Sequence, residues 1–343
     1  MGLIVVGGLV AGGVIGVSAY RRHRTEAAPA TWDPRITDLV GFVERERGLT
    51  FDHPVASHFL AEDEFVHLFD EPSGPADPER DHLEQDTSDM YSALGLASNY
   101  DPSAGQSTID QVSILGFYDP AVDEIFVRGD DLTPEVRTVL VHELTHALQA
   151  QHFQWRLGGP DDLQVRSVVE ADAMRIENRY VDSLPAGERA ASDEGTSLDA
   201  VGSAALADVP WAMMESDFAP YVLGPSFLEI VEQLGGAAAV DDALRDPPDQ
   251  EQLLDPWSYV NRAPDSEAPA PPTASAPVGT DVIYRSSTFE LFDATVMLDA
   301  WLPWQQTRRA LDGWNGGAMI VYAEGDHVCT SIAIREDDAA GAQ

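Results

Sequence analysis

The longest run of apolar residues at helical spacing lies between Thr133 and Trp155. These residues recur every three or four positions, which places them on one face of a helix. They are Val136, Val139, Leu140, Leu144, Ala147 and Leu148. Thr133 can cap the helix, and Pro134 stands in the first turn, where no amide proton is needed. The pattern predicts a long amphipathic helix over 133–155.

The same spacing, together with residues that start and stop helices, predicts further helices on both sides of this one. They are expected over 33–47, 62–69, 82–96, 162–181, 220–233 and 237–245, and over 288–311 with a break before Pro303. The stretch 186–207 is polar and rich in Ser, Gly and Ala, and it predicts a loop.

Short β-prone runs predict a smaller number of strands. They are residues 50–60, 113–118, 124–128, 319–323 and 328–334. The turn through Asp119 and Pro120 is typical of a hairpin, and Gly325 and Asp326 indicate a second hairpin near the C-terminus. We therefore expect an α+β fold that is rich in helices, with a small sheet beside the long helix.

The N-terminal residues differ from the rest of the chain. Residues 3–20 are uncharged, apolar and Gly-rich, and their number is close to that needed to cross a bilayer. We expect 1–24 to be a signal or membrane-anchor segment, which places the body outside the cytoplasm, anchored or secreted. Cleavage after the small residues 17–19 and a buried core helix are the alternatives, and the arginines at 21–24 would favour a cytoplasmic body.

Composition divides the remaining chain into three parts. Residues 263–278 contain five prolines and many alanines, so they are too poor in apolar bulk to pack and predict a linker or insert. A main domain is then expected over 31–262, and a C-terminal subdomain of a helix and a β-hairpin over 279–343.

The chain is strongly acidic, with 59 Asp and Glu residues against 20 Lys and Arg residues and a formal net charge of −39. Such a surface repels nucleic acids and anionic membranes. We therefore expect no nucleic-acid partner, and membrane contact through residues 3–20 alone. Cys329 is the single cysteine, which excludes an intrachain disulfide.

The predicted long helix contains a HExxH motif, His142-Glu143-Leu144-Thr145-His146. The two histidines are slightly more than one helical turn apart, so both imidazoles leave the same face and can bind one Zn²⁺. Glu143 projects beside them and can accept a proton from a water that the metal has made more acidic. The motif predicts a zinc hydrolase site with Glu143 as its general base.

A zinc site needs a third protein ligand, and two candidates follow from the sequence. His152 has the spacing of the HExxHxxGxxH pattern, but Gln149 stands where that pattern needs glycine to break the helix. Glu170 lies on the next predicted helix among apolar residues, where an unpaired carboxylate is unfavourable. Glu177 is the reserve candidate. A helix that continues past Gln149 carries His152 away from the ion, which favours Glu170.

Several segments resemble a family of exported zinc metallopeptidases common in actinobacteria. They include Phe117-Tyr118-Asp119-Pro120, Val127-Arg128-Gly129-Asp130, residues 142–153 with the sequence HELTHALQAQHF, and Glu170-Ala171-Asp172-Ala173. The resemblance covers about residues 45–334. It implies a gluzincin-like zincin fold in which His142, His146 and Glu170 bind zinc and Glu143 is the base.

Four further residues are candidates for supporting roles. Asp172 is a candidate to orient a ligand histidine through the second ring nitrogen. Tyr180, Tyr221 and Tyr259 are candidates to donate a hydrogen bond to a tetrahedral oxyanion, and a buried structural role is the alternative for each.

Together these features predict a zinc peptidase that acts on a peptide or protein substrate. Residues 124–128 precede the long helix, and we expect them to form the edge strand along which an extended peptide pairs. Two alternatives remain. One is a zinc hydrolase of a non-peptide amide, which would use the same residues. The other is a catalytically silent binding protein of the cell envelope that keeps zinc for structure alone.

Overall fold

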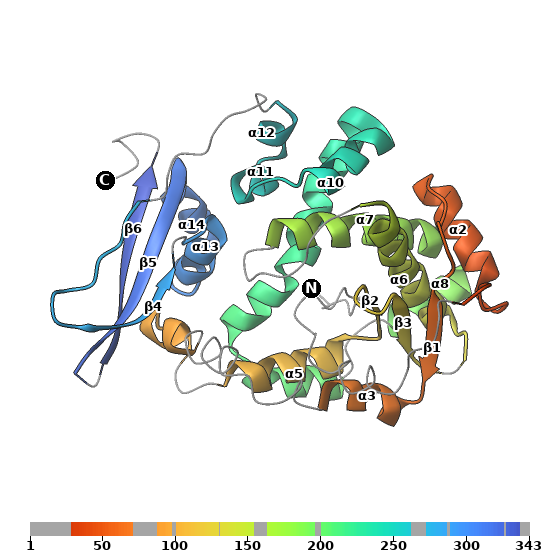
Figure 1. Cartoon of the computed structure of the whole chain (residues 1–343), viewed down its shortest axis with the longest axis horizontal. Coiled ribbons are helices and arrows are strands. Elements are labelled where there is room, and N and C mark those ends of the chain that lie inside the picture. The colour runs from red at the N-terminus through yellow and green to blue at the C-terminus, as the bar shows by residue number, and fades with distance from the viewer. Residues whose placement is uncertain are drawn as a thin grey trace. The chain divides into compact units, whose positions relative to one another are not determined.

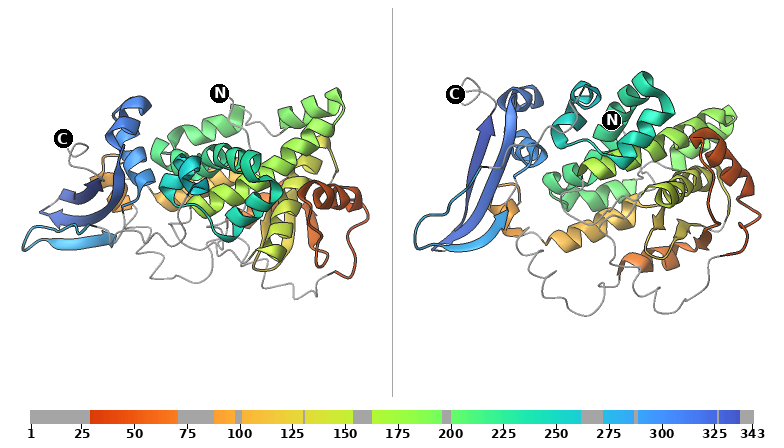
Figure 2. Two further views of the ribbon diagram at one scale, coloured as in Figure 1. Left: turned by 90° about the horizontal axis from the view of Figure 1, so that it is seen from above. Right: turned by 45° about the horizontal axis from the view of Figure 1, so that its top comes forward.

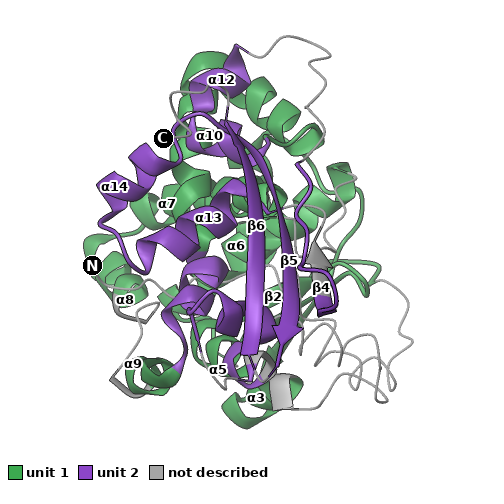
Figure 3. Cartoon of the chain, turned by 90° about the vertical axis from the view of Figure 1, so that its left-hand side faces the viewer, with its two compact units in different colours: residues 1–75, 107–208, 219–248 green, residues 76–106, 209–218, 249–343 purple. Residues whose placement is uncertain are grey.

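The computed structural model describes residues 29–70, 88–97, 101–129, 131–153, 163–195, 200–261, 272–286, 289–325 and 327–336. The chain divides into two compact units (Figure 3). The first comprises 1–75, 107–208 and 219–248, and the second 76–106, 209–218 and 249–343. The second unit thus contains the expected C-terminal subdomain together with three segments of the expected main domain, which are 76–106, 209–218 and 249–262. The expected signal or anchor segment and the expected loop tip at Asp326 lie outside the described residues.

The first unit contains a three-stranded sheet of β1 (Ala56–Leu60), β2 (Gly116–Asp119) and β3 (Glu124–Arg128) in the order β1-β3-β2. β2 and β3 pair antiparallel, which confirms the predicted hairpin, and β1 pairs parallel to β3. The expectation that 124–128 forms an edge strand is wrong, because β3 is paired on both sides. The distant segment β1 covers the edge that the hairpin alone would leave open.

The predicted long helix is α6 (Pro134–His152). Thr133 caps it, since its hydroxyl accepts a hydrogen bond from the Val136 amide at 3.2 Å, and Pro134 occupies the first turn. α6 contacts β2 and β3 as well as α2 (Thr37–Arg47), α7 (Leu163–Ser183) and α8 (Ala186–Gly195) (Figure 1). All residues from 138 to 149 are buried, so α6 is a central helix rather than an amphipathic surface helix.

The remaining helices of the first unit follow the predicted pattern with two differences. They are α3 (Glu62–Asp70), the end of α5 (Pro102–Ser113), α9 (Ala200–Ala205), a 3₁₀ turn η1 (Leu206–Asp208) and most of α10 (Trp211–Arg245). The sequence pattern predicted no helix at the position of α5. The loop expected over 186–207 is wrong for the residues of this range that the structure describes, because they form α8, α9 and η1. α8 packs against α6, and the hydroxyls of Ser192 and Thr138 form a 2.8 Å hydrogen bond between the two helices.

α10 contains the two predicted helices 220–233 and 237–245, which meet at Gly236. Gly236 has φ 65°, a left-handed conformation that glycine adopts without steric penalty. Earlier in the same helix, Gly224 approaches α7 closely. A Cβ atom at this position would lie 2.0 Å from the carbonyl oxygen of Ser167. α10 therefore packs against α7 only because residue 224 has no side chain.

The second unit contains an antiparallel sheet in the order β4 (Asp281–Ser286), β5 (Trp314–Glu324), β6 (His327–Glu336). β5 and β6 confirm the predicted C-terminal hairpin. Helices α13 (Leu291–Asp299) and α14 (Trp304–Ala310) lie on one face of the sheet, and the predicted break before Pro303 separates them (Figures 1 and 2). The unit also contains α11 (Gln250–Leu254), α12 (Pro256–Val260) and helical residues 88–93, the described part of the helix expected over 82–96.

Part of the expected linker packs on this sheet. Residues 262–271 lie outside the described residues, but Ala274 is buried against Ala318 and Ile320 of β5. The expectation that residues 263–278 cannot pack is therefore wrong for its described end. Small alanine side chains on both partners allow close contact without bulky apolar residues.

Both units combine helices with a small sheet, which confirms the α+β, helix-rich class. None of the helices that the structure describes is long and apolar enough to cross a bilayer.

Candidate metal centre

Three buried side chains of the first unit come together at the expected motif: His142 and His146 of α6 and Glu170 of α7. The Nε2 atom of His142 lies 3.1 Å from Oε2 of Glu170, and Nε2 of His146 lies 3.3 Å from the same oxygen. One ligand atom from each residue lies within 4.8 Å of the others. Within the described part of the chain, no other group of three His, Cys, Asp or Glu side chains has this spacing.

The spacing fits a metal ion. Two ligand atoms bound to one tetrahedral zinc at its usual bond lengths stand about 3.3 Å apart. Two buried polar atoms at the centre, Nε2 of His146 and Oε1 of Glu143, make no hydrogen bond with the residues described. Such atoms are unfavourable in a protein interior, and a bound cation with its water would satisfy both. His142, His146 and Glu170 could therefore hold a metal ion.

The charges of the cluster are strongly coupled. Burial opposes protonation of His142, but hydrogen bonds to Glu170 and Glu177 raise its pKa to about 10. Burial also opposes ionisation of Glu170, but His146 and His142 hold the pKa of this carboxyl well below its usual range. Glu170 is consequently a carboxylate at neutral pH, as an anionic metal ligand must be.

Glu177, the reserve candidate for the third ligand, lies on the other side of His142. Its Oε2 atom is 2.8 Å from Nδ1 of the ring. When Nδ1–H donates to this carboxylate, Nε2 keeps the lone pair that a metal needs. The structure therefore places Glu177 where it can orient His142 rather than bind the ion.

On His146, the second ring nitrogen contacts an amide rather than a carboxylate. Its Nδ1 lies 3.0 Å from Oε1 of Gln149, and Nε2 of Gln149 lies 3.0 Å from Oδ2 of Asp172. Asp172 was expected to contact a ligand histidine directly, but it faces away from Glu170 on α7 and reaches His146 only through Gln149. Arg47 and Arg175 contact the two oxygens of Asp172 at 2.8 and 2.7 Å.

Glu143 is completely buried beside the two histidines. The backbone amide of Tyr118, on β2, donates a hydrogen bond to its Oε2 at 2.8 Å. Burial raises the pKa of Glu143 well above its usual value, although the Tyr118 amide acts in the opposite direction. One oxygen is thus held in place while Oε1 has no hydrogen bond among the described residues. This arrangement suits a group that accepts and returns a proton.

His152 lies outside the metal centre. α6 continues without a break through His152, which is exposed and whose Nε2 lies 2.7 Å from the carbonyl oxygen of Thr50. The helix does not turn back at Gln149, so the spacing of the HExxHxxGxxH pattern does not produce a ligand here.

The three candidate tyrosines lie on three different helices. Tyr180 follows Glu170 by ten residues on α7, about 15 Å along the helix axis, and its ring packs edge-on against Phe42. Tyr221 lies on α10, and Tyr259 lies on α12 in the second unit. The position of Tyr180 on α7 argues against it as an oxyanion donor, whereas Tyr221 and Tyr259 stay predictions.

Gln149 and Tyr118 also contact the site, and neither was among the residues predicted from the sequence. Gln149 is three residues after His146, on the same helix face, so helical spacing was a usable signal. Tyr118 contributes its backbone amide, which every residue except proline possesses, so its side chain gave no signal.

No protein-family model, curated protein or solved structure matches this chain. The site itself is a buried centre of two histidines on the HExxH helix α6 and one glutamate on α7.

Proposed function

We propose that this protein is a zinc-dependent peptidase with a gluzincin-like fold, in which His142, His146 and Glu170 bind Zn²⁺ and Glu143 is the general base. One observation carries the proposal. Three possible ligand atoms lie within 4.8 Å of one another, next to the buried carboxylate of Glu143, whose Oε1 makes no hydrogen bond with the residues described. Three protein ligands leave a fourth position open, as zinc hydrolases require. The HExxH motif and the resemblance to exported zinc metallopeptidases support zinc and peptide substrates.

A zinc ion held by these residues would supply Lewis acidity, which lowers the pKa of water and polarises a carbonyl group. Glu143 takes a proton from the attacking water through Oε1, while the Tyr118 amide keeps its other oxygen in place. The protonated carboxyl then returns the proton to the departing amine.

We also propose that the substrate is a peptide or protein and that the body acts outside the cytoplasm, because residues 3–20 have the composition of an export or anchor segment. β3 is the central strand and is not available for pairing with a substrate. A non-peptide amide would be hydrolysed by the same residues, and only a cleavage assay separates the two substrate classes.

A second candidate function has an observation in its favour. His142, His146, Glu170 and Glu143 are all completely buried, and closed sites are typical of structural zinc. A binding protein with structural zinc would explain this burial. It would leave unexplained the free oxygen of Glu143, since a structural site does not need a base.

Substitution Glu143→Gln separates these functions. Glutamine keeps an oxygen for the Tyr118 amide but is not basic, and residue 143 is not a proposed ligand, so zinc should stay bound. Zinc-dependent cleavage of a peptide library should fall about 10²–10⁴-fold, the usual size of a general-base contribution. Glu135→Gln is the matched control on the same helix, and it should keep both zinc and activity.

Equal cleavage by the wild type and Glu143→Gln, with zinc bound in both, would exclude Glu143 as the base. A wild type that binds zinc but shows no zinc-dependent cleavage would support the structural role instead.

A further inference from the structure

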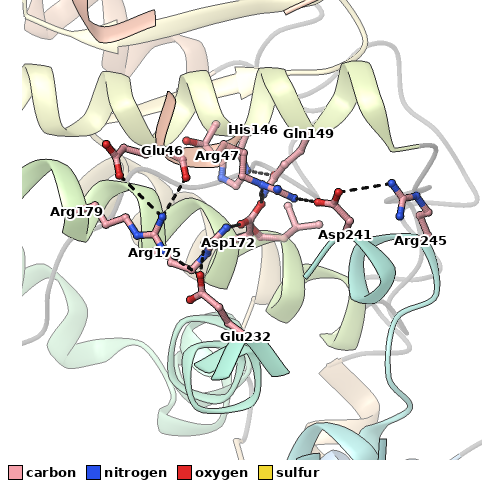
Figure 4. A network of polar contacts seen from close by, with 12 residues as sticks. Glu46, Arg47, His146, Gln149, Asp172, Arg175, Arg179, Glu232, Asp241 and Arg245 are labelled. Carbon is pink, nitrogen blue, oxygen red and sulfur yellow. Dashed lines mark hydrogen bonds and ion pairs between the residues drawn. The ribbon is translucent and has the colours of Figure 1, made fainter. Parts of the chain in front are cut away.

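The Nδ1 side of His146, opposite the proposed metal, faces a chain of buried polar contacts (Figure 4). The chain runs from His146 to Gln149 on α6, then to Asp172 on α7, and then to Arg47 on α2. Each step is a hydrogen bond or ion pair of 2.8–3.0 Å. Arg47 and Asp172 are 125 residues apart in the sequence.

The orientation of the Gln149 amide follows from its neighbours. Its Nε2 atom lies 3.0 Å from both Oδ2 of Asp172 and the carbonyl oxygen of Val169. A carboxylate and a carbonyl can only accept hydrogen bonds, so the NH₂ group of Gln149 must point at them. Its oxygen therefore faces His146, and Nδ1 of that ring must be the donor. The remaining nitrogen, Nε2, carries the lone pair and points toward Glu170.

Asp172 is held as an anion that cannot turn away. Its side chain has no exposed surface, and Arg47 and Arg175 contact one oxygen each. Arg47 is itself fixed from the far side by Asp241 on α10 at 2.6 Å.

The charge of Arg175 is also paired with a carboxylate of α10. Arg175 contacts Glu232 on α10 at 2.6 Å, and Arg179 contacts the same carboxylate at 2.9 Å (Figure 4). A buried charge is tolerated when it is paired and hydrogen-bonded. The network therefore holds Asp172 rigidly, and each arginine named here forms an ion pair with a carboxylate.

We infer that Gln149, Asp172 and Arg47 are positioning residues that hold His146 in the tautomer and orientation that bind the metal. The inference rests on the proposed metal site. The two histidines therefore differ in what contacts Nδ1. His142 has the carboxylate of Glu177 there, whereas His146 has the neutral amide of Gln149. The buried ion pair of Asp172 and Arg47 fixes the orientation of that amide.

The test compares two glutamines of α6. Gln149→Leu removes the hydrogen bonds to His146, Val169 and Asp172. Gln151→Leu is the matched control, since Gln151 also makes side-chain hydrogen bonds, to the amide of Asp52 at 2.7 Å and the carbonyl of His53 at 3.1 Å, but makes no contact with His146. Zinc affinity, measured by competition with a chelator, should fall about 10–100-fold in Gln149→Leu, the usual effect of losing a partner of a ligand histidine. The control should match the wild type.

A second measurement uses the unaltered protein. In the imidazole ¹⁵N–¹H spectrum of the zinc-loaded wild type, His146 should show an Nδ1–H signal that exchanges slowly with solvent. In Gln149→Leu, or in Asp172→Asn if the first variant does not fold, this proton should exchange faster, whereas the corresponding His142 signal should be unchanged. If Gln149 were only structural, Gln149→Leu would lower the free energy of unfolding, but the Nδ1–H proton of His146 would not exchange faster than that of His142.

The outcomes separate this inference from the proposed function. Zinc binding in the wild type with equal affinity in Gln149→Leu and Gln151→Leu would overturn the positioning role and leave the metal site intact. Failure of the zinc-loaded wild type to show a protected Nδ1–H on His146 would also overturn it. A wild type that does not bind zinc would overturn both proposals. Reduced affinity in Gln149→Leu with unchanged cleavage in Glu143→Gln would keep the positioning role and remove the proposed mechanism.

Discussion

His146 and His152 stand six residues apart on one helix and meet opposite surroundings. His146 is completely buried, with its Nε2 3.3 Å from Glu170. His152 is exposed and contacts only a backbone carbonyl among the interactions described, that of Thr50 at 2.7 Å, and its ring lies near Phe153. At the scale of the residue, burial and contact with Glu170 make His146 a proposed ligand, whereas exposure makes His152 a polar residue at a helix end.

Glu170→Ala should therefore lose most of the zinc affinity, while His152→Ala should change it little. A zinc site binds with roughly 10–16 kcal/mol in total, so one ligand of several accounts for a loss on the order of 10²-fold or more. Chelator competition on the two purified variants measures both values. A larger loss in His152→Ala than in Glu170→Ala would mean that the gluzincin-type ligand set is wrong.

α7 is the element that brings Glu170, Asp172 and Glu177 to α6, and its position depends on α10. Gly224 of α10 lies against α7 so closely that a Cβ atom would be 2.0 Å from the oxygen of Ser167 and 3.1 Å from Cβ of Ala171. The closest atom is backbone and cannot rotate away. At the scale of the element, Gly224 thus allows α10 to approach α7 closely. The position of Glu170 on α7 depends on this packing.

Gly224→Ala should force α10 and α7 apart. Overpacking of this kind lowers the free energy of unfolding by about 1–3 kcal/mol or more, and zinc affinity should fall as well because Glu170 moves with α7. Urea denaturation and chelator competition measure the two effects.

Gly41→Ala is the control, since Gly41 lies within α2 and a Cβ there has no atom within 4 Å. It should raise the free energy of unfolding by about 0.5–1 kcal/mol, the usual gain for alanine over glycine in a helix. Equal stabilities of Gly224→Ala and Gly41→Ala would show that the two helices tolerate a side chain at position 224.

The whole molecule combines an apolar N-terminal segment with a body of high negative charge. The formal net charge of the chain is −39, which opposes adsorption of the body to anionic lipid. Apolar residues 3–20 are the part of the sequence with the composition to enter a bilayer. Association with a membrane should therefore depend on this segment alone.

Expressed in a GC-rich Gram-positive host, the full chain should fractionate with the membrane, and its body should be digested by protease added from outside. A chain that begins at Thr31 should remain in the soluble fraction of the cell. Full-length protein in the cytosol, protected from added protease, would contradict the export proposal and favour a buried helix over residues 3–20.

Much of the fold was predictable because it depends on residues close in the sequence. The apolar spacing of α6, its cap at Thr133, the β2–β3 hairpin and the break before Pro303 all rest on neighbours within a few positions. The same is true of the HExxH pair, since a helix alone brings residues 142 and 146 to one face. The sequence by itself therefore determined the α+β class, the helix that carries the motif and the candidate ligands.

Tertiary structure decided the features that depend on distant segments. β1 pairs with β3 and makes it a central strand, and α8 forms where a polar composition predicted a loop. Glu177 contacts His142 across 35 residues, and Arg47 contacts Asp172 across 125. These partners are set by how helices and strands pack, and packing leaves no periodic pattern near either residue. For that reason the sequence could indicate which residues are candidates to bind a metal, but only the folded chain shows what holds them in place.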